Sequence, residues 1–355
     1  MLSLGLSQKI LTIGCSFDPP KGGIAQVLWT YQHDVFPVFH FVVNSKKGST
    51  LRNLLICVRA LIVVAYILAT HRNIRIVHIH TASNRSFVRS TWFGSLARVF
   101  NRKVVYHIHG GGFKKYVAAS PKTVVEKLQR ADAVIALSET WKQFFAEEIC
   151  CRNVYVLGNV IARPKITERS QTNRSLSLLY FGLITEKKGI FDLIEAVANC
   201  RKNGLAVELH IGGNGDIESM NSLIDSLALR EHVHYHGWVS GEDKERLFND
   251  CDLFVLPSYV EGLPLAILEA MSYGKPIIST YVGAIPEIVE NGVNGVLINP
   301  GEKEALSNSI ATYVNNPQKL TDHASHAMAT AQQFLPEHIA QKLGNIYNSL
   351  LNDPL

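Results

Sequence analysis

The chain has 355 residues, of which 47% are apolar and 18% are charged, and its mean hydropathy is +0.08. At roughly 150 residues per domain, this length favours two domains and excludes a small module that depends on disulfides or metal. The composition excludes a disordered chain, and no uncharged run reaches the eighteen or so residues that a membrane span requires.

The net charge of +5 conceals two halves of opposite sign. Residues 1–170 contain 23 basic and 8 acidic side chains, whereas the remaining residues contain 12 and 22. No acidic residue lies between Asp34 and Glu126, an interval with 14 lysines and arginines. Such segregation indicates a partner with anionic phosphates, which could be nucleic acid, an anionic membrane or a phosphorylated substrate. A solvated basic face without a partner is the alternative.

Short β-rich runs alternate with longer helical stretches along the whole chain, a rhythm typical of parallel βαβ construction. The sequence therefore predicts an α/β protein with two doubly wound domains. The expected strands of the first half are Ile10–Ile13, Phe39–Val43, Ile76–Ile79, Val104–His107, Ala133–Leu137 and Val154–Val156. Those of the second half are Leu178–Phe181, Glu208–Ile211, Val233–Tyr235, Leu253–Leu256, Pro276–Thr280 and Val296–Ile298.

The domain boundaries follow from a polar segment between the two sets of strands. Residues 162–175 contain a proline and have no apolar period, which is typical of a linker. We therefore expect an N-terminal domain over residues 1–161 and a C-terminal domain over residues 176–337. The amphipathic stretch 338–355 must dock on a domain, and we expect it to complete the N-terminal one.

The apolar run Leu54–Ala69 is the one segment that suggests a membrane. Arg59 interrupts it, and sixteen helical residues span only about 24 Å, so we interpret it as a buried crossover helix. The alternative is a helix in the membrane interface, with Arg52 and Arg59 reaching lipid phosphates.

The six cysteines have no CxxC or metal-ligand spacing, and the N-terminus lacks the features of a signal peptide. We expect reduced core cysteines in a cytoplasmic protein.

The segment PSYVEGLPLAILEAMSYG, residues 257–274, carries the clearest chemistry. We expect a helix to start near Leu263–Pro264, where free backbone N–H groups and the helix dipole would bind an anion. Glu269 lies among apolar residues of that helix, so its carboxylate needs a partner, such as a ribose hydroxyl or a loop amide. A strand, loop and helix without a ligand would explain the spacing of Glu261 and Glu269 equally well.

This segment, EGLPLAILE with AMSYGKPIIST and VGAIPEIVENGVNGVLI after it, resembles the donor-binding half of the retaining glycosyltransferases of family four. Four further segments match that family in order and spacing: PPKGGIAQV (19–27), FGLITEKKGIFDLIEA (181–196), HIGGNGD (210–216) and HGWVS (236–240). The resemblance implies the GT-B fold, in which two Rossmann-like domains face a central cleft.

The resemblance also implies roles for individual residues of the C-terminal domain. Lys188 and the segment of Gly262, Leu263 and Pro264 would bind the donor diphosphate. Glu269 would bind the ribose and Glu261 the donor sugar. Gly213 would allow close backbone approach, and Trp238 and Val239 would line the base pocket. The alternatives without a functional role are a solvent-exposed lysine for Lys188, a turn glycine for Gly213 and a core tryptophan for Trp238. The family usually has an arginine after the first glycine of the FGLITEKKG segment, whereas this chain has Leu183. Lys187 is one candidate to supply the missing positive charge.

In the N-terminal domain, Gly22 and Gly23 would let the donor approach the backbone, and His109 would lie beside the donor sugar, neutral or charged near pH 7. A tight turn and a structural histidine are the corresponding alternatives.

The function that the resemblance implies is sugar transfer from a nucleoside diphosphate sugar to a hydroxyl of a glycan or lipid-linked acceptor, in cell-surface polysaccharide or lipopolysaccharide assembly. Retention would proceed by front-face attack without an enzyme nucleophile. No metal and no other cofactor are expected, because the HExxH string is absent and the family that the sequence resembles lacks a metal-binding Asp-x-Asp motif.

The basic N-terminal domain would meet an anionic membrane surface, which makes the protein peripheral on the inner face of the cytoplasmic membrane. Three alternatives remain: a GT-B epimerase or phosphorylase, a catalytically silent subunit and a nucleic-acid-binding protein. The acidic second half would repel nucleic acid, so we expect none as a partner.

Overall fold

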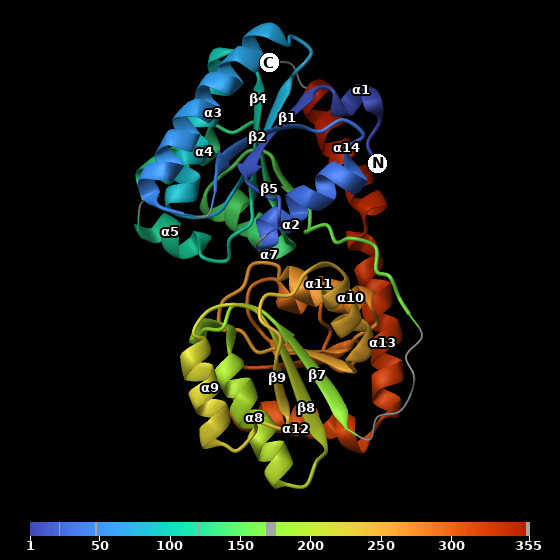
Figure 1. Cartoon of the computed structure of the whole chain (residues 1–355). Coiled ribbons are helices and arrows are strands. Elements are labelled where there is room, and N and C mark those ends of the chain that lie inside the picture. Colours follow the sequence, from blue (N-terminus) through green and yellow to red (C-terminus); the bar gives the residue numbers. More distant parts are fainter. Residues whose placement is uncertain (21, 47, 120, 168–174, 353–355) are drawn as a thin grey trace. The chain divides into compact units, whose positions relative to one another are not determined.

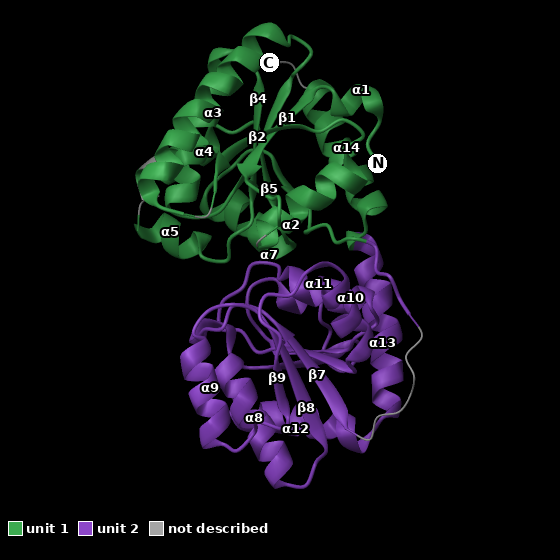
Figure 2. Cartoon of the chain, viewed as in Figure 1, with its two compact units in different colours: residues 1–162, 334–355 green, residues 163–333 purple. Residues whose placement is uncertain are grey.

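The computed structural model describes residues 1–20, 22–46, 48–119, 121–167 and 175–352. The chain forms two compact units, residues 1–162 with 334–355 and residues 163–333 (Figures 1 and 2). Each unit contains one six-stranded parallel sheet flanked by helices. The predicted α/β class with two doubly wound domains is confirmed. Half of the proposed linker, residues 168–174, lies outside the described residues.

Unit 1 has the strand order β2-β1-β3-β4-β5-β6. Its two central strands, β3 and β4, are buried at every position, as expected for strands covered on both faces. The strands are β1 (Ile10–Cys15), β2 (His40–Ser45), β3 (Ile76–Thr81), β4 (Lys103–Ile108), β5 (Ala133–Ala136) and β6 (Val154–Val156). The helices are α1 (Leu4–Ser7), α2 (Gly23–Thr30), η1 (Tyr31–Val35), α3 (Thr50–Thr70), α4 (Arg85–Val99), α5 (Phe113–Ala119), α6 (Pro121–Gln129), α7 (Glu139–Gln143), η2 (Phe144–Glu148) and α14 (Pro336–Asn352).

Unit 2 has the order β12-β11-β10-β7-β8-β9, so the winding reverses between the paired strands β7 and β10. Ligands of open parallel sheets bind beyond the carboxyl ends of strands at such a reversal. The strands are β7 (Leu176–Phe181), β8 (Val207–Gly212), β9 (Val233–Tyr235), β10 (Leu253–Leu256), β11 (Ile277–Thr280) and β12 (Gly295–Ile298). The helices are η3 (Glu186–Lys188), α8 (Ile190–Lys202), α9 (Ile217–Ser226), α10 (Gly241–Asp250), α11 (Leu265–Ser272), η4 (Ile285–Glu287), α12 (Lys303–Asn315) and α13 (Gln318–Ala331), with η5 (Gln332–Phe334) leading back to unit 1.

The C-terminal helix α14 belongs to unit 1 (Figure 2). Its apolar stripe is buried and includes Ile339, Leu343 and Leu350. The Tyr347 hydroxyl lies 2.6 Å from Nδ1 of His78 in β3, which gives the docked helix a buried polar contact.

Helix α3 corrects one sequence interpretation. It does connect β2 to β3 as a crossover, but it is buried on one face only, through Cys57, Ala60, Val64 and Leu68. A helix that covers a sheet buries a single stripe, and in α3 most residues outside that stripe are apolar as well, Arg52 and Arg59 being the charged exceptions. The prediction of a buried helix is therefore wrong for the outer face of α3, which is exposed.

The six cysteines, all of them among the described residues, form no disulfide, and five of them are buried or partly buried. The expectation of core cysteines is wrong for Cys150, which is exposed.

Candidate functional site

The loop after β10 and the loop after β7 meet where the winding of unit 2 reverses. Gly189, with φ +69°, ends the turn η3, and a Cβ at this position would overlap the carbonyl oxygen of Pro257. The Tyr259 amide donates to the Lys187 carbonyl at 2.9 Å. Glycine is thus needed for the close approach of the two loops, which brings their polar side chains together.

Lys188 and Glu261 form the centre of this loop pair. The Lys188 ammonium lies 2.5 Å from Oε1 of Glu261, and the buried Ser258 hydroxyl donates to the same oxygen at 2.9 Å. The Glu261 side chain is 8% exposed and that of Lys188 is 26% exposed. Two predicted site residues that are 73 positions apart therefore share one contact, with the cation on the more accessible side.

Helix α11 begins at Leu265, with Pro264 as its N-cap residue, slightly later than the predicted start near Leu263–Pro264. The first amides of a helix have no acceptor within it, so the N–H groups of Leu265 and Ala266 remain available to an anion. Gly262 and Leu263 are buried just before the helix, and the Gly262 carbonyl accepts from the Ala284 amide at 2.8 Å.

Glu269 has a partner that the sequence did not suggest. Both of its carboxylate oxygens accept from the Lys244 ammonium of α10, at 2.7 and 2.6 Å. The Glu269 side chain is 15% exposed, so the expected enclosure is present, but the partner is a lysine rather than an amide. Lys244 precedes Glu269 by 25 residues in an ordinary surface-helix pattern, and only the fold brings the two together.

The loops after β8 and β9 hold the remaining predicted residues of unit 2. Gly213 has φ +156°, and a Cβ there would overlap the Gly182 carbonyl oxygen, so packing alone requires glycine. Its amide donates to Gly237 at 2.7 Å, close to Trp238 and Val239. Trp238 is 40% exposed, which rules out the core alternative. Leu183 is 50% exposed and supplies no charge in place of the missing arginine.

In unit 1, His109 follows β4 and is held by two polar partners. Its Nδ1 lies 3.2 Å from Oδ1 of Asn159, and its Nε2 lies 2.9 Å from Nδ1 of His80. Since an amide oxygen only accepts, Nδ1 of His109 carries the proton and Nε2 accepts from His80. Burial lowers the pKa of His109 to about 4, although Asn159 opposes the shift. The imidazole is therefore neutral at pH 7. Of the two charge states that the sequence left open for His109, the structure supports the neutral one.

Gly22 and Gly23 stand where β1 leads into α2, with Gly22 at φ +114° as the N-cap. No heavy atom lies within 4 Å of a Cβ built on either glycine. Backbone conformation requires glycine at position 22, whereas Gly23 borders open space.

Comparisons with known proteins fit this geometry. Residues 163–330 match the family model of the group 1 glycosyl transferases. This part of the chain belongs to that family.

The proteins that resemble the chain include two curated relatives and one solved structure. A putative colanic acid biosynthesis glycosyltransferase, WcaL of Salmonella typhimurium, is 28% identical over 52% of this chain and 48% of its own length. The amylovoran biosynthesis glycosyltransferase AmsK of Erwinia amylovora is 26% identical over 69% of this chain and 63% of its own length. The match thus spans about half to two thirds of these relatives. The structure of Anabaena HepE in complex with UDP has a TM-score of 0.76 and 22% identity, and the match covers 96% of this chain and 100% of HepE. This similarity shows a shared GT-B fold.

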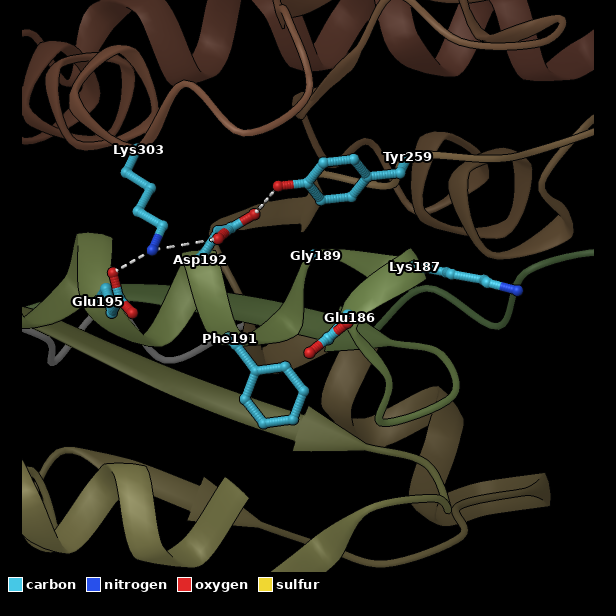
Figure 3. Close-up of a pocket in the computed structure, with 8 residues that line it drawn as sticks. All are labelled: Glu186, Lys187, Gly189, Phe191, Asp192, Glu195, Tyr259 and Lys303. Atoms are coloured by element: carbon cyan, nitrogen blue, oxygen red, sulfur yellow. Dashed lines mark hydrogen bonds and ion pairs between the residues drawn. The ribbon is translucent and has the colours of Figure 1, made fainter. Parts of the chain in front are cut away.

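A pocket of about 480 Å³ lies beside the Lys188 turn of the glycosyl transferase unit (Figure 3). Lys303 contacts Glu195 at 2.5 Å and Asp192 at 3.5 Å, and Tyr259 donates to Asp192 at 2.7 Å. In Figure 3 the Lys187 ammonium points away from these carboxylates. The pocket is lined by Glu186, Lys187, Gly189, Phe191, Asp192, Glu195, Tyr259 and Lys303. Its acidic lining disfavours a diphosphate, and of the residues considered for the donor only Lys187, the candidate to compensate for the missing arginine, lines it.

Two groups of side chains in the described part of the chain have the spacing of metal ligands: His78, His80 and His107 in unit 1, and Glu208, His210 and His234 in unit 2. The sequence did not reveal them, because their members lie on neighbouring strands. Burial lowers the pKa of His78 to about 3, and burial also holds the pKa values of His80 and His107 well below 6.5. These neutral rings stack behind His109, whose ring centroid lies 4.1 Å from that of His107.

Proposed function

We propose that the protein is a retaining, metal-independent glycosyltransferase that moves a sugar from a nucleoside diphosphate donor to a hydroxyl group. The observation that carries the proposal is the arrangement of Glu261 and Glu269. In a unit of the group 1 glycosyl transferase family, each of these enclosed carboxylates is held by a lysine beyond the strand ends where the sheet reverses.

The donor would occupy unit 2. Lys188 and the first amides of α11 would bind the diphosphate, Glu261 would accept from a sugar hydroxyl, and Glu269 would accept from the ribose. In this state Lys188 would move from Glu261 towards a phosphate oxygen, and Lys244 would keep the Glu269 carboxylate oriented. Trp238 and Val239 would border the base. The UDP complex of HepE supports a nucleoside diphosphate without fixing the base for this chain.

The transfer step needs no group beyond donor and acceptor. The acceptor oxygen bonds to the anomeric carbon on the face from which the diphosphate leaves, while the bond from that carbon to the phosphate oxygen breaks. The electron pair of the broken bond goes to the diphosphate, which takes the acceptor proton. Lys188 and the α11 amides would stabilise the negative charge that develops on the diphosphate.

The acceptor would be a glycan or lipid-linked glycan of a cell-surface polysaccharide, in line with the names of the WcaL and AmsK relatives. Unit 1 would supply the acceptor site together with His109, Gly22 and Gly23. Its basic surface would meet an anionic membrane, and the protein would then lie on the inner face of the cytoplasmic membrane.

The test is a transfer assay with purified protein, a panel of nucleoside diphosphate sugars and membrane-extracted acceptor. We expect nucleoside diphosphate to be released only when acceptor is added, at a rate that EDTA does not change. NMR of the product should show the anomeric configuration of the donor. Release without acceptor would favour an epimerase or a hydrolase, and inverted product would contradict retention.

A further inference from the structure

The outer face of α3 in unit 1 is a continuous apolar surface. Its members lie on one side of the helix and are 39–69% exposed: Leu51, Leu54, Leu55, Val58, Ile62, Val63 and Tyr66. The opposite side, at Cys57, Ala60, Val64 and Leu68, is at most 3% exposed. Single exposed leucines are ordinary on protein surfaces, but seven large apolar side chains on one helix face indicate an interaction site.

Helix α4 lies beside α3 and extends this surface (Figure 1). Arg85, at the start of α4, donates to the Thr50 hydroxyl at the start of α3 at 3.1 Å, which aligns the two helices. Val88, Trp92 and Val99 share the exposed side of α4. Of the 18 large apolar residues that are exposed in the described part of the chain, ten lie on these two helices, so the apolar exposure is concentrated here.

The charged residues on the two helices that form this apolar surface are all positive. The sequence has no acidic residue between Asp34 and Glu126, so neither helix carries one. Arg52 and Arg59 are exposed on α3 next to the apolar stripe. Lys46, Lys114 and Lys115 are exposed on neighbouring segments, where Lys114 pairs with Glu148 at 3.5 Å. Arginine and lysine can place their alkyl stems on an apolar layer while the charged ends reach phosphates above it.

These observations favour a lipid bilayer over a second copy of the chain. A symmetric dimer through this face would bring the same arginines towards each other without a compensating carboxylate. A bilayer with anionic headgroups instead satisfies the apolar face and the positive rim together.

Helix α3 is long and apolar enough to cross a membrane by length and composition, with a mean hydropathy of 2.2 over its most apolar window. Its inner face, however, packs against β2 and completes the core of unit 1. Spanning a bilayer would remove that face from the sheet and place Arg59 near the middle of the hydrocarbon layer. The helix therefore fits a position parallel to the membrane.

We propose that the outer face of α3, extended by Val88, Trp92 and Val99 of α4, inserts into the interface of an anionic bilayer while Arg52 and Arg59 contact lipid phosphates. The proposal gives the membrane contact of the basic unit a defined surface. It does not depend on sugar transfer, because it rests on unit 1 alone.

The experiment is flotation of the full chain with vesicles of phosphatidylglycerol and phosphatidylethanolamine, compared with phosphatidylcholine vesicles. Wild-type protein should bind the anionic vesicles and bind the neutral ones much more weakly. Leu55→Ser with Ile62→Ser, and Ile62→Ser alone, should lower the partition coefficient, the double variant by at least about tenfold. Arg52→Gln and Arg59→Gln should each lower it by about fivefold on anionic vesicles only.

The matched control replaces exposed apolar residues outside the surface, Leu4→Ser with Ile166→Ser, and should bind like wild type. Circular dichroism and Tm of every variant verify folding separately from transfer activity. Brominated lipid should quench wild-type fluorescence, and Trp92→Phe should remove most of that quenching. Wild-type binding by the double serine variant, equal binding to neutral vesicles, or a dimer in light scattering that this variant dissociates would overturn the proposal.

Discussion

The two units share an architecture and differ in how they accommodate polar and charged groups. Unit 1 carries 21 basic and 9 acidic residues, and unit 2 carries 14 and 21. Unit 1 buries neutral histidines behind His109 and leaves an apolar helix face open. Unit 2 encloses carboxylates that lysines neutralise, at Lys188–Glu261 and Lys244–Glu269. The same parallel sheet thus supports two kinds of surface, and the loops and helices beyond the strand ends decide which kind forms.

The largest expected effect concerns the lysine and carboxylate pairs of unit 2. Lys188→Ala and Glu269→Ala should each lower the transfer rate by about a hundredfold or more, since in the proposed function each removes a group that would hold the donor or its developing charge. Steady-state kinetics measure this, with unchanged circular dichroism as the check on folding. Lys202→Ala removes an exposed lysine at the far end of α8 and should behave as wild type. A wild-type transfer rate in Lys188→Ala or in Glu269→Ala would contradict the role proposed for that residue.

The second prediction is that acid destabilises unit 1 before unit 2. Burial lowers the pKa of His109 to about 4 and of His78 to about 3, and it holds the pKa values of His80 and His107 well below 6.5. Below about pH 6.5 these histidines bind protons in the unfolded chain but stay neutral in the folded unit. The free energy of unfolding of unit 1 therefore falls as the pH drops. The slope is up to about 1.4 kcal/mol per pH unit for each histidine.

Hydrogen exchange between pH 7.5 and 5.5, corrected for the intrinsic rate, measures this difference. Protection of β3 and β4 should fall more steeply than that of β7 and β8. Unit 2 has three histidines with a lowered pKa: His210 at about 4, His236 and His323. The His210 ring is partly exposed and His236 is exposed, which leaves only His323 buried, against three buried histidines in unit 1. Equal loss of protection in both units would argue against the histidine account.

The sequence predicts the fold well because buried parallel strands are short runs of β-branched residues. Each of the twelve expected strands overlaps an observed one, as Val233–Tyr235 and Leu253–Leu256 illustrate. It predicts less where tertiary contacts decide. The partner of Glu269 comes from a different helix, and composition alone could not tell whether the outer face of α3 would be covered.

A smaller effect is expected where the C-terminal helix docks on unit 1. Tyr347→Phe removes the hydroxyl that lies 2.6 Å from Nδ1 of His78 and leaves that buried nitrogen without this partner, which should cost about 1–3 kcal/mol. Tyr155→Phe is the matched control, because its hydroxyl contact with Ser349 is longer, at 3.4 Å, and exposed. It should change stability by no more than about 0.5 kcal/mol. Urea unfolding measures both, and similar losses would contradict the assigned difference.

The smallest effect concerns Lys244. Lys244→Met leaves Glu269 without its cation and should weaken nucleotide-sugar binding by about tenfold, whereas Lys244→Arg should restore most of it. Calorimetric titration with the preferred donor gives both constants, with Lys202→Met as the control. Unchanged affinity in Lys244→Met would mean that Glu269 is oriented without this lysine.

The central claim is that the loops after β7 and β10 bind a nucleoside diphosphate sugar through Lys188. The most direct measurement is the Tm of wild type and Lys188→Ala across a concentration series of nucleoside diphosphate sugars. A bound donor raises stability with the logarithm of its concentration over its dissociation constant. We predict such a rise for at least one donor in wild type and its loss in Lys188→Ala. No rise with any donor, or the same rise in both proteins, would contradict the account.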